Sequence, residues 1–264
     1  MWQPMRALCL LMLGLLTSAS AGAQVAAGVN AEAVTQQLVA GRAAELYAER
    51  LAALRAAHAL DVHGAVLERV RRIAGGLIAQ ARRDYPDSAD WAWELHVTTD
   101  EEHLADGMAG GKMLLGEAYL ERLEIADAEL AMLLAHEMAH ALLRHNLLEY
   151  QLALRLDRGW ARRPFLALEE AVESDSALIA KLAPQGLAQE AEADREGLLL
   201  AWRAGWPAAR LANYFKKLAR GSGLPNFDSA THPSPASRWA AARALAATLP
   251  AGAAWPDGDG RLFP

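Results

Sequence analysis

Cysteine is almost absent from this sequence, since Cys9 is the only one and lies in an apolar run near the N-terminus. A fold held together by disulfide bonds is therefore excluded, and the chain has to depend on its apolar core. Basic patches are missing as well. The 26 lysine and arginine residues are scattered along the chain and are outnumbered by 32 acidic residues. This composition argues against nucleic acid as a partner and weakly against anionic membrane surfaces.

Long hydrophobic runs are also lacking. Residues 7–16 form an apolar run that is too short to cross a bilayer, and no later stretch is long enough either. The run follows the positive charge of Arg6 and precedes small residues up to Ala23, an order typical of a secretory signal peptide. We expect residues 1–23 to be removed after Ala23, leaving a periplasmic protein without a transmembrane segment; an uncleaved anchor is the alternative. Any membrane association would then be peripheral.

Residues 133–141 form an apolar stretch interrupted by His136, Glu137 and His140. The stretch has no proline or glycine and is rich in alanine and leucine, which predicts a helix. On a helix His136 and His140 lie one above the other and can share one ion, an arrangement that suits zinc. Glu137 is turned about 100° round the helix, so it can take a proton from a metal-activated water without binding the metal. The alternative is a chance pair of packed histidines, although burying three such groups without partners is costly.

A third ligand is expected from the helix predicted over residues 187–203. Glu190 and Asp194 are four residues apart and share a face, whereas Glu192 points elsewhere, into solvent. Glu190 can supply a carboxylate oxygen to the ion, and Asp194 can accept the free ring N–H of a ligating histidine. A charged, exposed helix is the alternative for this segment alone. Together with the paired histidines it gives the two-histidine, one-carboxylate set of a catalytic zinc site.

The remaining pattern is mostly helical. Apolar spacing and turn residues predict two strands, over residues 91–99 and late in 107–116, and Asp127 as the N-cap of the helix with the paired histidines. Pro184 is expected to end a helix. The predicted helices cover residues 34–60, 64–85, 117–123, 128–144, 165–182, 187–203, 208–219 and 236–247.

The sequence resembles the M48 family of zinc metallopeptidases over about residues 64–247. The matching motifs stand in the expected order: Gly110-Gly111-Lys112, Glu129-Leu130, His136-Glu137 with His140, Arg144-His145, Glu190 with Asp194, Gly205-Trp206-Pro207, and Thr231-His232-Pro233 with Arg238. The resemblance implies that His136, His140 and Glu190 bind one Zn²⁺ per chain, that Glu137 is the general base, and that Asp194 supports a ligand. It also implies a zincin-like α+β fold, mainly helical with a small β-sheet beside the active-site helix. The segment 104–109 departs from the usual pattern, which leaves the shape of the substrate cleft open.

Two residues near the C-terminus carry further hypotheses. His232 could point at the metal and occupy its open position in a resting form, or assist the transition state; the alternative is that it shapes a His-Pro turn. Arg238 could neutralise a carboxylate or stabilise a developing oxyanion, or else form a structural salt bridge. The remaining histidines have no partner spacing and are predicted to be exposed or structural: His58, His63, His96, His103 and His145.

These observations predict a zinc-dependent endopeptidase of the cell envelope that hydrolyses misfolded or unassembled proteins, a role in protein quality control. Residues 24–63 would form an N-terminal helical arm, residues 64–247 the peptidase domain and residues 248–264 a Pro/Gly-rich tail. The strand near residues 113–115 would bind substrate by edge pairing. The alternative is an exported chaperone or assembly factor with a latent zinc site. A structural zinc protein does not fit, because closed structural sites favour cysteine ligands.

Overall fold

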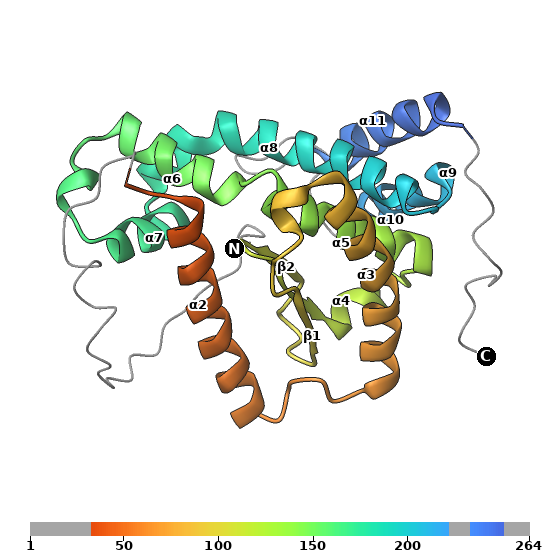
Figure 1. Ribbon diagram of the computed structural model, residues 1–264. Helices are drawn as coiled ribbons and strands as arrows, with labels where there is room; N and C mark the ends of the chain where they lie inside the picture. Colours follow the sequence, from red (N-terminus) through yellow and green to blue (C-terminus); the bar gives the residue numbers. More distant parts are fainter. Residues whose placement is uncertain (1–32, 222–232, 251–264) are drawn as a thin grey trace.

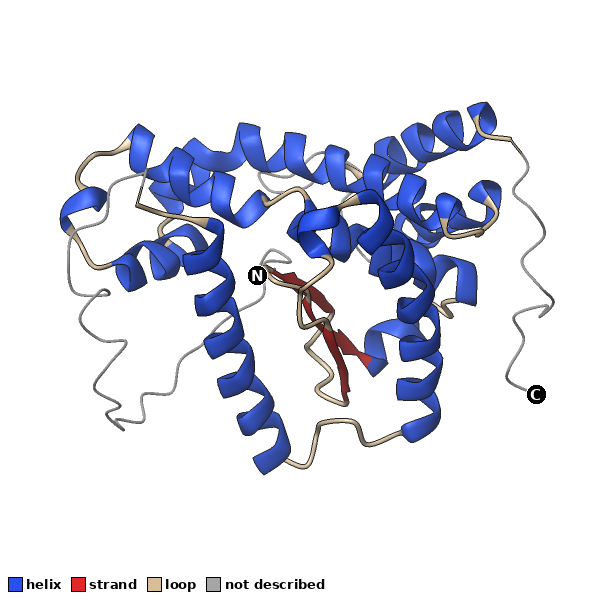
Figure 2. Cartoon of the chain, viewed as in Figure 1, coloured by secondary structure: helices blue, strands red, loops and turns tan. Residues whose placement is uncertain are grey.

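The computed structural model describes residues 33–221 and 233–250, and its chain is mainly helical with one three-stranded sheet (Figures 1 and 2). The predicted signal peptide, His232 and most of the predicted tail lie outside these residues. The elements are α2 Gln36–Ala56, α3 Gly64–Asp84, η1 Pro86–Ser88, β1 Glu94–Thr98, β2 Ala105–Met108, β3 Lys112–Gly116, α4 Glu117–Arg122, α5 Asp127–Leu142, α6 His145–Leu156, η2 Trp160–Arg162, α7 Phe165–Ser174, α8 Ser176–Arg203, α9 Ala208–Leu211, α10 Asn213–Gly221 and α11 Pro235–Thr248. The fold is α+β and zincin-like, as predicted. Within the described ranges, none of the helices has the length and apolar character that a membrane span needs.

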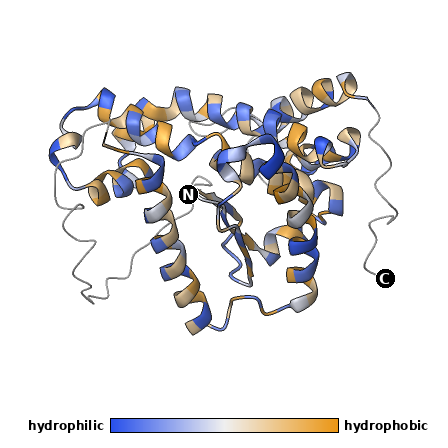
Figure 3. Cartoon of the chain, in the orientation of Figure 1, coloured by the Kyte–Doolittle hydropathy of each residue, from blue (hydrophilic) through white to orange (hydrophobic). Residues whose placement is uncertain are grey.

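Helix α5 is the centre of the core. Nearly every side chain along it is buried, because α3, α8, α10 and the sheet pack around it. A helix that is apolar on all sides is stable only when it is enclosed in this way. Figure 3 shows hydrophilic and hydrophobic positions alternating along α8, which has one face on α5 and the other towards solvent. The core therefore surrounds the helix that carries His136, Glu137 and His140.

The sheet has the strand order β1-β3-β2, with β1 parallel and β2 antiparallel to β3. Strand β2 was not predicted, because its four residues, Ala105–Met108, do not alternate between apolar and polar. A tight turn joins β2 to β3, and Gly110 and Gly111 have φ angles of 79° and 82° that favour glycine. A Cβ on Gly111 would also lie 2.7 Å from the Trp93 ring. Because β3 is the central strand, the prediction that residues 113–115 offer an edge to substrate is wrong.

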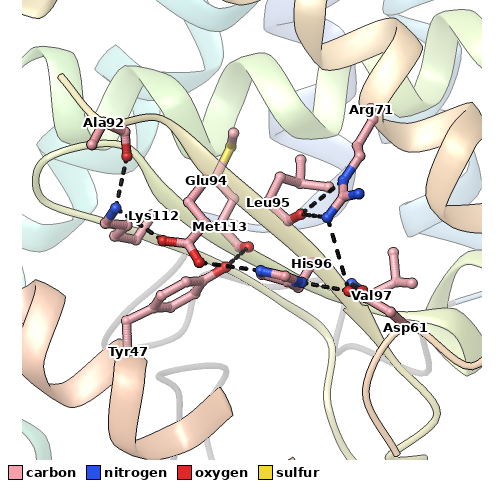
Figure 4. Close-up of polar contacts among 10 residues, drawn as sticks. All are labelled: Tyr47, Asp61, Arg71, Ala92, Glu94, Leu95, His96, Val97, Lys112 and Met113. Atoms are coloured by element: carbon pink, nitrogen blue, oxygen red, sulfur yellow. Dashed lines mark hydrogen bonds and ion pairs between the residues drawn. The ribbon is translucent and has the colours of Figure 1, made fainter. Parts of the chain in front are cut away.

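The outer edge of β1 is covered by polar groups (Figure 4). The Asp61 carboxylate accepts a hydrogen bond from Val97 N at 3.0 Å, and Asp61 N donates to Val97 O at 2.9 Å. The Arg71 guanidinium donates two bonds to Leu95 O, at 3.3 and 3.2 Å. His96 lies between Asp61 and Glu94, with nitrogen-to-oxygen distances of 2.6 and 3.2 Å. These contacts occupy the backbone groups that another strand would need.

Helix α2 packs across the sheet on the side away from α5. The Tyr47 hydroxyl donates to Met113 O at 2.6 Å, and Arg50 pairs with Asp106 of β2 at 2.5 Å. Tyr47 and Leu51 are buried against β3. The segment predicted as an N-terminal arm therefore includes a helix that contacts β3 and β2 on the face of the sheet away from α5.

The structure differs from the predicted helices at several points, and α6, His145–Leu156, was not predicted at all. Helices α7 and α8 are separated at Asp175, whose carboxylate accepts from Ala177 N and Leu178 N, and α8 then runs through Pro184 to Arg203. A buried face over 28 residues offsets the hydrogen bond that Pro184 removes.

Helix α5 begins after Ala126, whose N–H donates to the Glu129 carboxylate at 2.8 Å, so Asp127 is not the N-cap. Asp127 instead pairs with Arg69 and Arg72 of α3. The helix predicted over residues 208–219 is two helices, α9 and α10, which meet at Ala212.

Candidate metal centre

The crossing of α5 and α8 brings the two halves of the site together. Gly197 of α8 lies directly against the backbone of His136, and a Cβ there would be 2.8 Å from His136 N. Only glycine permits two helices to approach so closely at this point. The crossing places Glu190, two turns earlier on α8, beside the paired histidines of α5.

His136, His140 and Glu190 converge on one point between the helices. The Nε2 atoms of the two histidines are 3.2 Å apart. Glu190 Oε1 lies 3.3 Å from His140 Nε2, and Oε2 lies 3.7 Å from His136 Nε2. Tetrahedral ligands at 2.0–2.1 Å from an ion are about 3.3 Å from each other, so this triangle of two ring nitrogens and one carboxylate is close to the spacing that a zinc site needs. Three protein ligands leave a fourth position open for water or substrate, as a catalytic site requires.

Asp194 supports His136 from behind. Its Oδ1 is 3.0 Å from His136 Nδ1, the ring nitrogen that faces away from the triangle. Burial alone would lower the pKa of His136. The carboxylates of Asp194 and Glu190 outweigh burial, so the pKa of His136 is raised. The negative charge that raises this pKa also attracts a cation to the Nε2 side.

Arg238, predicted as a cation near the site, is held by Asp194. Its guanidinium donates two hydrogen bonds to the carboxylate, at 2.7 and 2.6 Å, and lies 3.8 Å from Glu190. Burial disfavours the ionised carboxyl, but the Arg238 charge outweighs burial and lowers the pKa of Asp194. The arginine therefore keeps Asp194 an acceptor for His136. Its geometry is that of the salt bridge weighed in the sequence analysis.

Glu137 lies on the side of α5 that meets β2. A Cβ on Gly107 of β2 would be only 2.5 Å from Glu137 O, so strand and helix are in direct contact at the general-base candidate. Burial raises the pKa of the Glu137 carboxyl. The two ligand histidines lower this pKa, the carboxylates of Asp106 and Glu190 raise it, and the net shift is upward. A carboxylate with a raised pKa is suited to accepting and returning a proton near neutral pH.

His145 belongs to the site, although its spacing gave no reason to place it there. It is 3% exposed, and its Nδ1 lies 3.0 Å from Nδ1 of His140. Burial, followed by the charge of His140, lowers the pKa of His145 to about 3, so its ring is neutral at physiological pH. Glu192, predicted to be solvated, has a side chain that is 57% exposed, yet its Oε2 is 3.4 Å from His145 Nε2. The Arg144-His145 motif was the one signal that marked this position in the sequence.

The other described histidines with ring contacts lie against different elements. His63 pairs with Glu117, His96 with Asp61 and Glu94, and His103 with Leu114 O and Arg50. Among the described residues, the group formed by the two paired histidines and Glu190 is the one whose ligand atoms could hold a metal ion together.

The model of peptidase family M48 matches residues 64–246. The chain therefore belongs to peptidase family M48 and is a metalloendopeptidase, an enzyme that acts on polypeptides. Members of the family are metal-dependent and usually use zinc. No curated protein matches the sequence significantly.

Proposed function

We propose that this M48 peptidase is a zinc-dependent endopeptidase of the cell envelope that hydrolyses misfolded or unassembled proteins. One observation carries the catalytic part: the Nε2 atoms of two histidines of α5 are 3.2 Å apart, and the Glu190 carboxylate of α8 lies beside both, with Oε1 3.3 Å from His140 Nε2 and Oε2 3.7 Å from His136 Nε2. His136, His140 and Glu190 are assigned as the ligands and Glu137 as the general base. Asp194 fixes the orientation of His136, and Arg238 fixes Asp194.

Bound zinc would polarise the scissile carbonyl and lower the pKa of a water from 15.7 to about 7. Glu137 takes a proton from the attacking water and returns it to the leaving amine. Its raised pKa favours the first of these transfers, because a carboxylate with a higher pKa is a stronger base. The three ligands, Asp194 and Arg238 keep their positions during these steps, because α5 and α8 are packed in the core.

Strand β2 is the edge that substrate would use. Gly116 N donates to Leu104 O at 2.8 Å, and hydrogen-bonded pairs alternate along an antiparallel ladder. The backbone groups of Ala105 and Gly107 therefore point away from β3, towards the open side of the sheet. An extended peptide paired there would run past Glu137, because Gly107 touches that residue. Recognition through the main chain tolerates many side chains, as a quality-control peptidase needs.

The envelope location rests on the N-terminal sequence. Arg6, the apolar run over residues 7–16 and the small residues up to Ala23 support export and cleavage after Ala23. A chain with Cys9 as its single cysteine would keep no thiol after this cleavage, so the enzyme would not respond to the oxidising conditions of the periplasm.

The test of the catalytic assignment is the variant Glu137→Gln. It removes the base but keeps the size of the side chain, so we expect the zinc content of wild type and a loss of at least about 10³-fold in hydrolysis of unfolded casein. Zinc is measured by elemental analysis, and a chelator gives the metal-free baseline. His140→Ala is the matched control, because it removes a ligand and should lose the metal itself.

Substantial casein cleavage by Glu137→Gln would contradict the base assignment. Metal-loaded wild type that binds unfolded proteins without cleaving them would favour the exported chaperone or assembly factor instead. The natural substrates are found by comparing the envelope proteins that accumulate with Glu137→Gln against those in cells with wild type.

A further inference from the structure

His145 contacts the second of the paired histidines and has no part in the function proposed above. The two rings meet edge on, with centroids 4.8 Å apart and planes at 82°. The His145 side chain is 3% exposed, so water does not compete for the contact between the two Nδ1 atoms. On its far side, Nε2 of His145 faces the Glu192 carboxylate.

The backbone at Arg144 brings His145 to this position. On an unbroken helix, residues five apart point about 140° away from each other, so His145 would face away from His140. Arg144 instead adopts a left-handed conformation, with φ 60° and ψ 37°, between α5 and α6. This conformation is unfavourable for a residue with a side chain.

Two contacts hold this turn. Arg144 pairs with Asp87, and the Gln189 amide donates to His145 O at 3.2 Å. Gln189 precedes the ligand Glu190 on α8, so the same helix fixes the ligand and the turn. A strained residue held from two sides is a reason to look for a function at the position it creates.

We infer that His145 is a positioning residue that fixes the tautomer and orientation of His140 as a zinc ligand; the inference rests on the proposed function. His140 faces the triangle with Nε2, which must keep its lone pair to bind an ion, so its ring proton is on Nδ1. This N–H donates to Nδ1 of His145. Because Nδ1 of His145 accepts this bond, the ring proton of His145 is on Nε2, which donates to Glu192. One arrangement of the ring protons therefore gives a donor and an acceptor for each contact among His140, His145 and Glu192.

The two ligand histidines are therefore supported in different ways. Asp194 lies directly beside the His136 ring, 3.0 Å from Nδ1, whereas Glu192 reaches His140 through the ring of His145. Loss of such a support typically weakens metal binding 10- to 100-fold. Glu192 contributes less than His145, because its side chain is 57% exposed.

The experiment measures zinc affinity rather than hydrolysis. Metal-free full-length protein is titrated with zinc in competition with a chromogenic chelator, and the Co²⁺-substituted form is compared by its visible absorption spectrum. We expect His145→Leu to weaken zinc binding about 10- to 100-fold and to alter the Co²⁺ spectrum. His145→Asn places an amide oxygen close to the position of Nδ1, so it should recover most of the affinity and the wild-type spectrum.

Two further variants are controls. Glu192→Gln should weaken zinc binding less than His145→Leu does. His63→Leu should leave the affinity unchanged, because His63 is an exposed histidine paired with Glu117. Thermal unfolding of each metal-free variant shows that the fold is retained.

Unchanged zinc affinity in His145→Leu would overturn the inference. Equal weakening in the Leu and Asn variants, with both folded, would also overturn it, because the ring would then act by packing and not as an acceptor. A wild-type protein that takes up no zinc would instead overturn the proposed function, an outcome separate from the other two.

Discussion

The two edges of the small sheet differ in whether other groups bond their outward-facing backbone. The outward backbone groups of β1 are bonded by Asp61, Arg71 and the chain at Ala59, whereas those of Ala105 and Gly107 in β2 point away from β3, and Gly107 lies against Glu137 of α5. Both edges belong to the same three strands, so intrinsic strand propensity does not explain the difference. The difference lies in the neighbours: a loop closes one edge, and the other runs beside Glu137.

This contrast indicates why a three-stranded sheet can stand beside a peptide-binding site without aggregating. An exposed edge invites pairing with any extended chain, so an edge without a function is usually covered. Polar side chains close β1 without adding a strand. Strand β2 remains available, and the proposed substrate is the chain that pairs with it.

Among substitutions at the two edges of the sheet, the largest effect is expected from Gly107→Ala in β2. The new Cβ would lie 2.5 Å from Glu137 O and has to push strand and helix apart. A displacement of this size at a catalytic group typically costs about 10²-fold in rate. We expect casein hydrolysis to fall by about this factor while the zinc content stays at the wild-type level.

Gly41→Ala is the matched control for that variant. Gly41 lies in α2, and a Cβ there would meet nothing within 4 Å. Alanine is favoured over glycine inside a helix, so stability should rise by about 0.5–1 kcal/mol with activity unchanged. Full activity in Gly107→Ala would show that β2 does not set the position of Glu137.

A smaller effect, on stability only, is expected from Asp61→Ala at the closed edge. The substitution removes the acceptor of Val97 N and the partner of His96, and it places alanine at a φ of 53°. We expect the free energy of unfolding in urea to fall by about 1–3 kcal/mol, with the activity of the folded fraction unchanged.

Asp61→Asn separates these contributions, because asparagine tolerates the left-handed backbone and keeps a side-chain oxygen for Val97 N. It should lose less stability than Asp61→Ala. If either variant lost more activity than its loss of folded protein explains, the β1 edge would also contribute to the active site.

The smallest effect concerns pH and the start of β2. His103 is buried, its Nε2 donates to Leu114 O at 3.1 Å, and its Nδ1 accepts from Arg50 at 3.2 Å. Burial and the charge of Arg50 lower the pKa of His103. The carboxylates of Asp106 and Asp100 raise it by less, so the net shift is downward. The unfolded chain therefore takes up a proton near pH 6.5, whereas the folded chain takes one up only at a lower pH.

The stability contributed by neutral His103 is therefore present above pH 6.5 and is lost as the pH falls below it. Between pH 7.5 and 5.5 we expect wild type to lose about 1 kcal/mol more unfolding free energy than His103→Gln, measured by urea denaturation of the metal-free proteins. Equal losses in the two proteins would mean that His103 is protonated in the folded state.

Local spacing predicted the elements better than their boundaries. Helices α2, α3 and α11 begin and end within a few residues of the predicted limits, because their apolar periodicity is clear. The prediction failed at Pro184, where burial over a long helix outweighed one missing hydrogen bond, and at Asp175, where a side-chain cap starts a new helix. It also missed β2, whose residues Ala105–Met108 become a strand only by pairing with β3.

The sequence by itself determined that His136 and His140 share one helix face with Glu137 beside them, because helical periodicity is a local property of the chain. The sequence also suggested Glu190 as the third ligand, but only the tertiary structure decided how Glu190 meets the two histidines, that His145 turns back onto His140, and which strands form the edges of the sheet. Each of these depends on contacts between distant segments: the close crossing at Gly197, the left-handed turn at Arg144 and the pairing on both sides of β3. Residue spacing along the chain carries no information about such contacts until the core has packed.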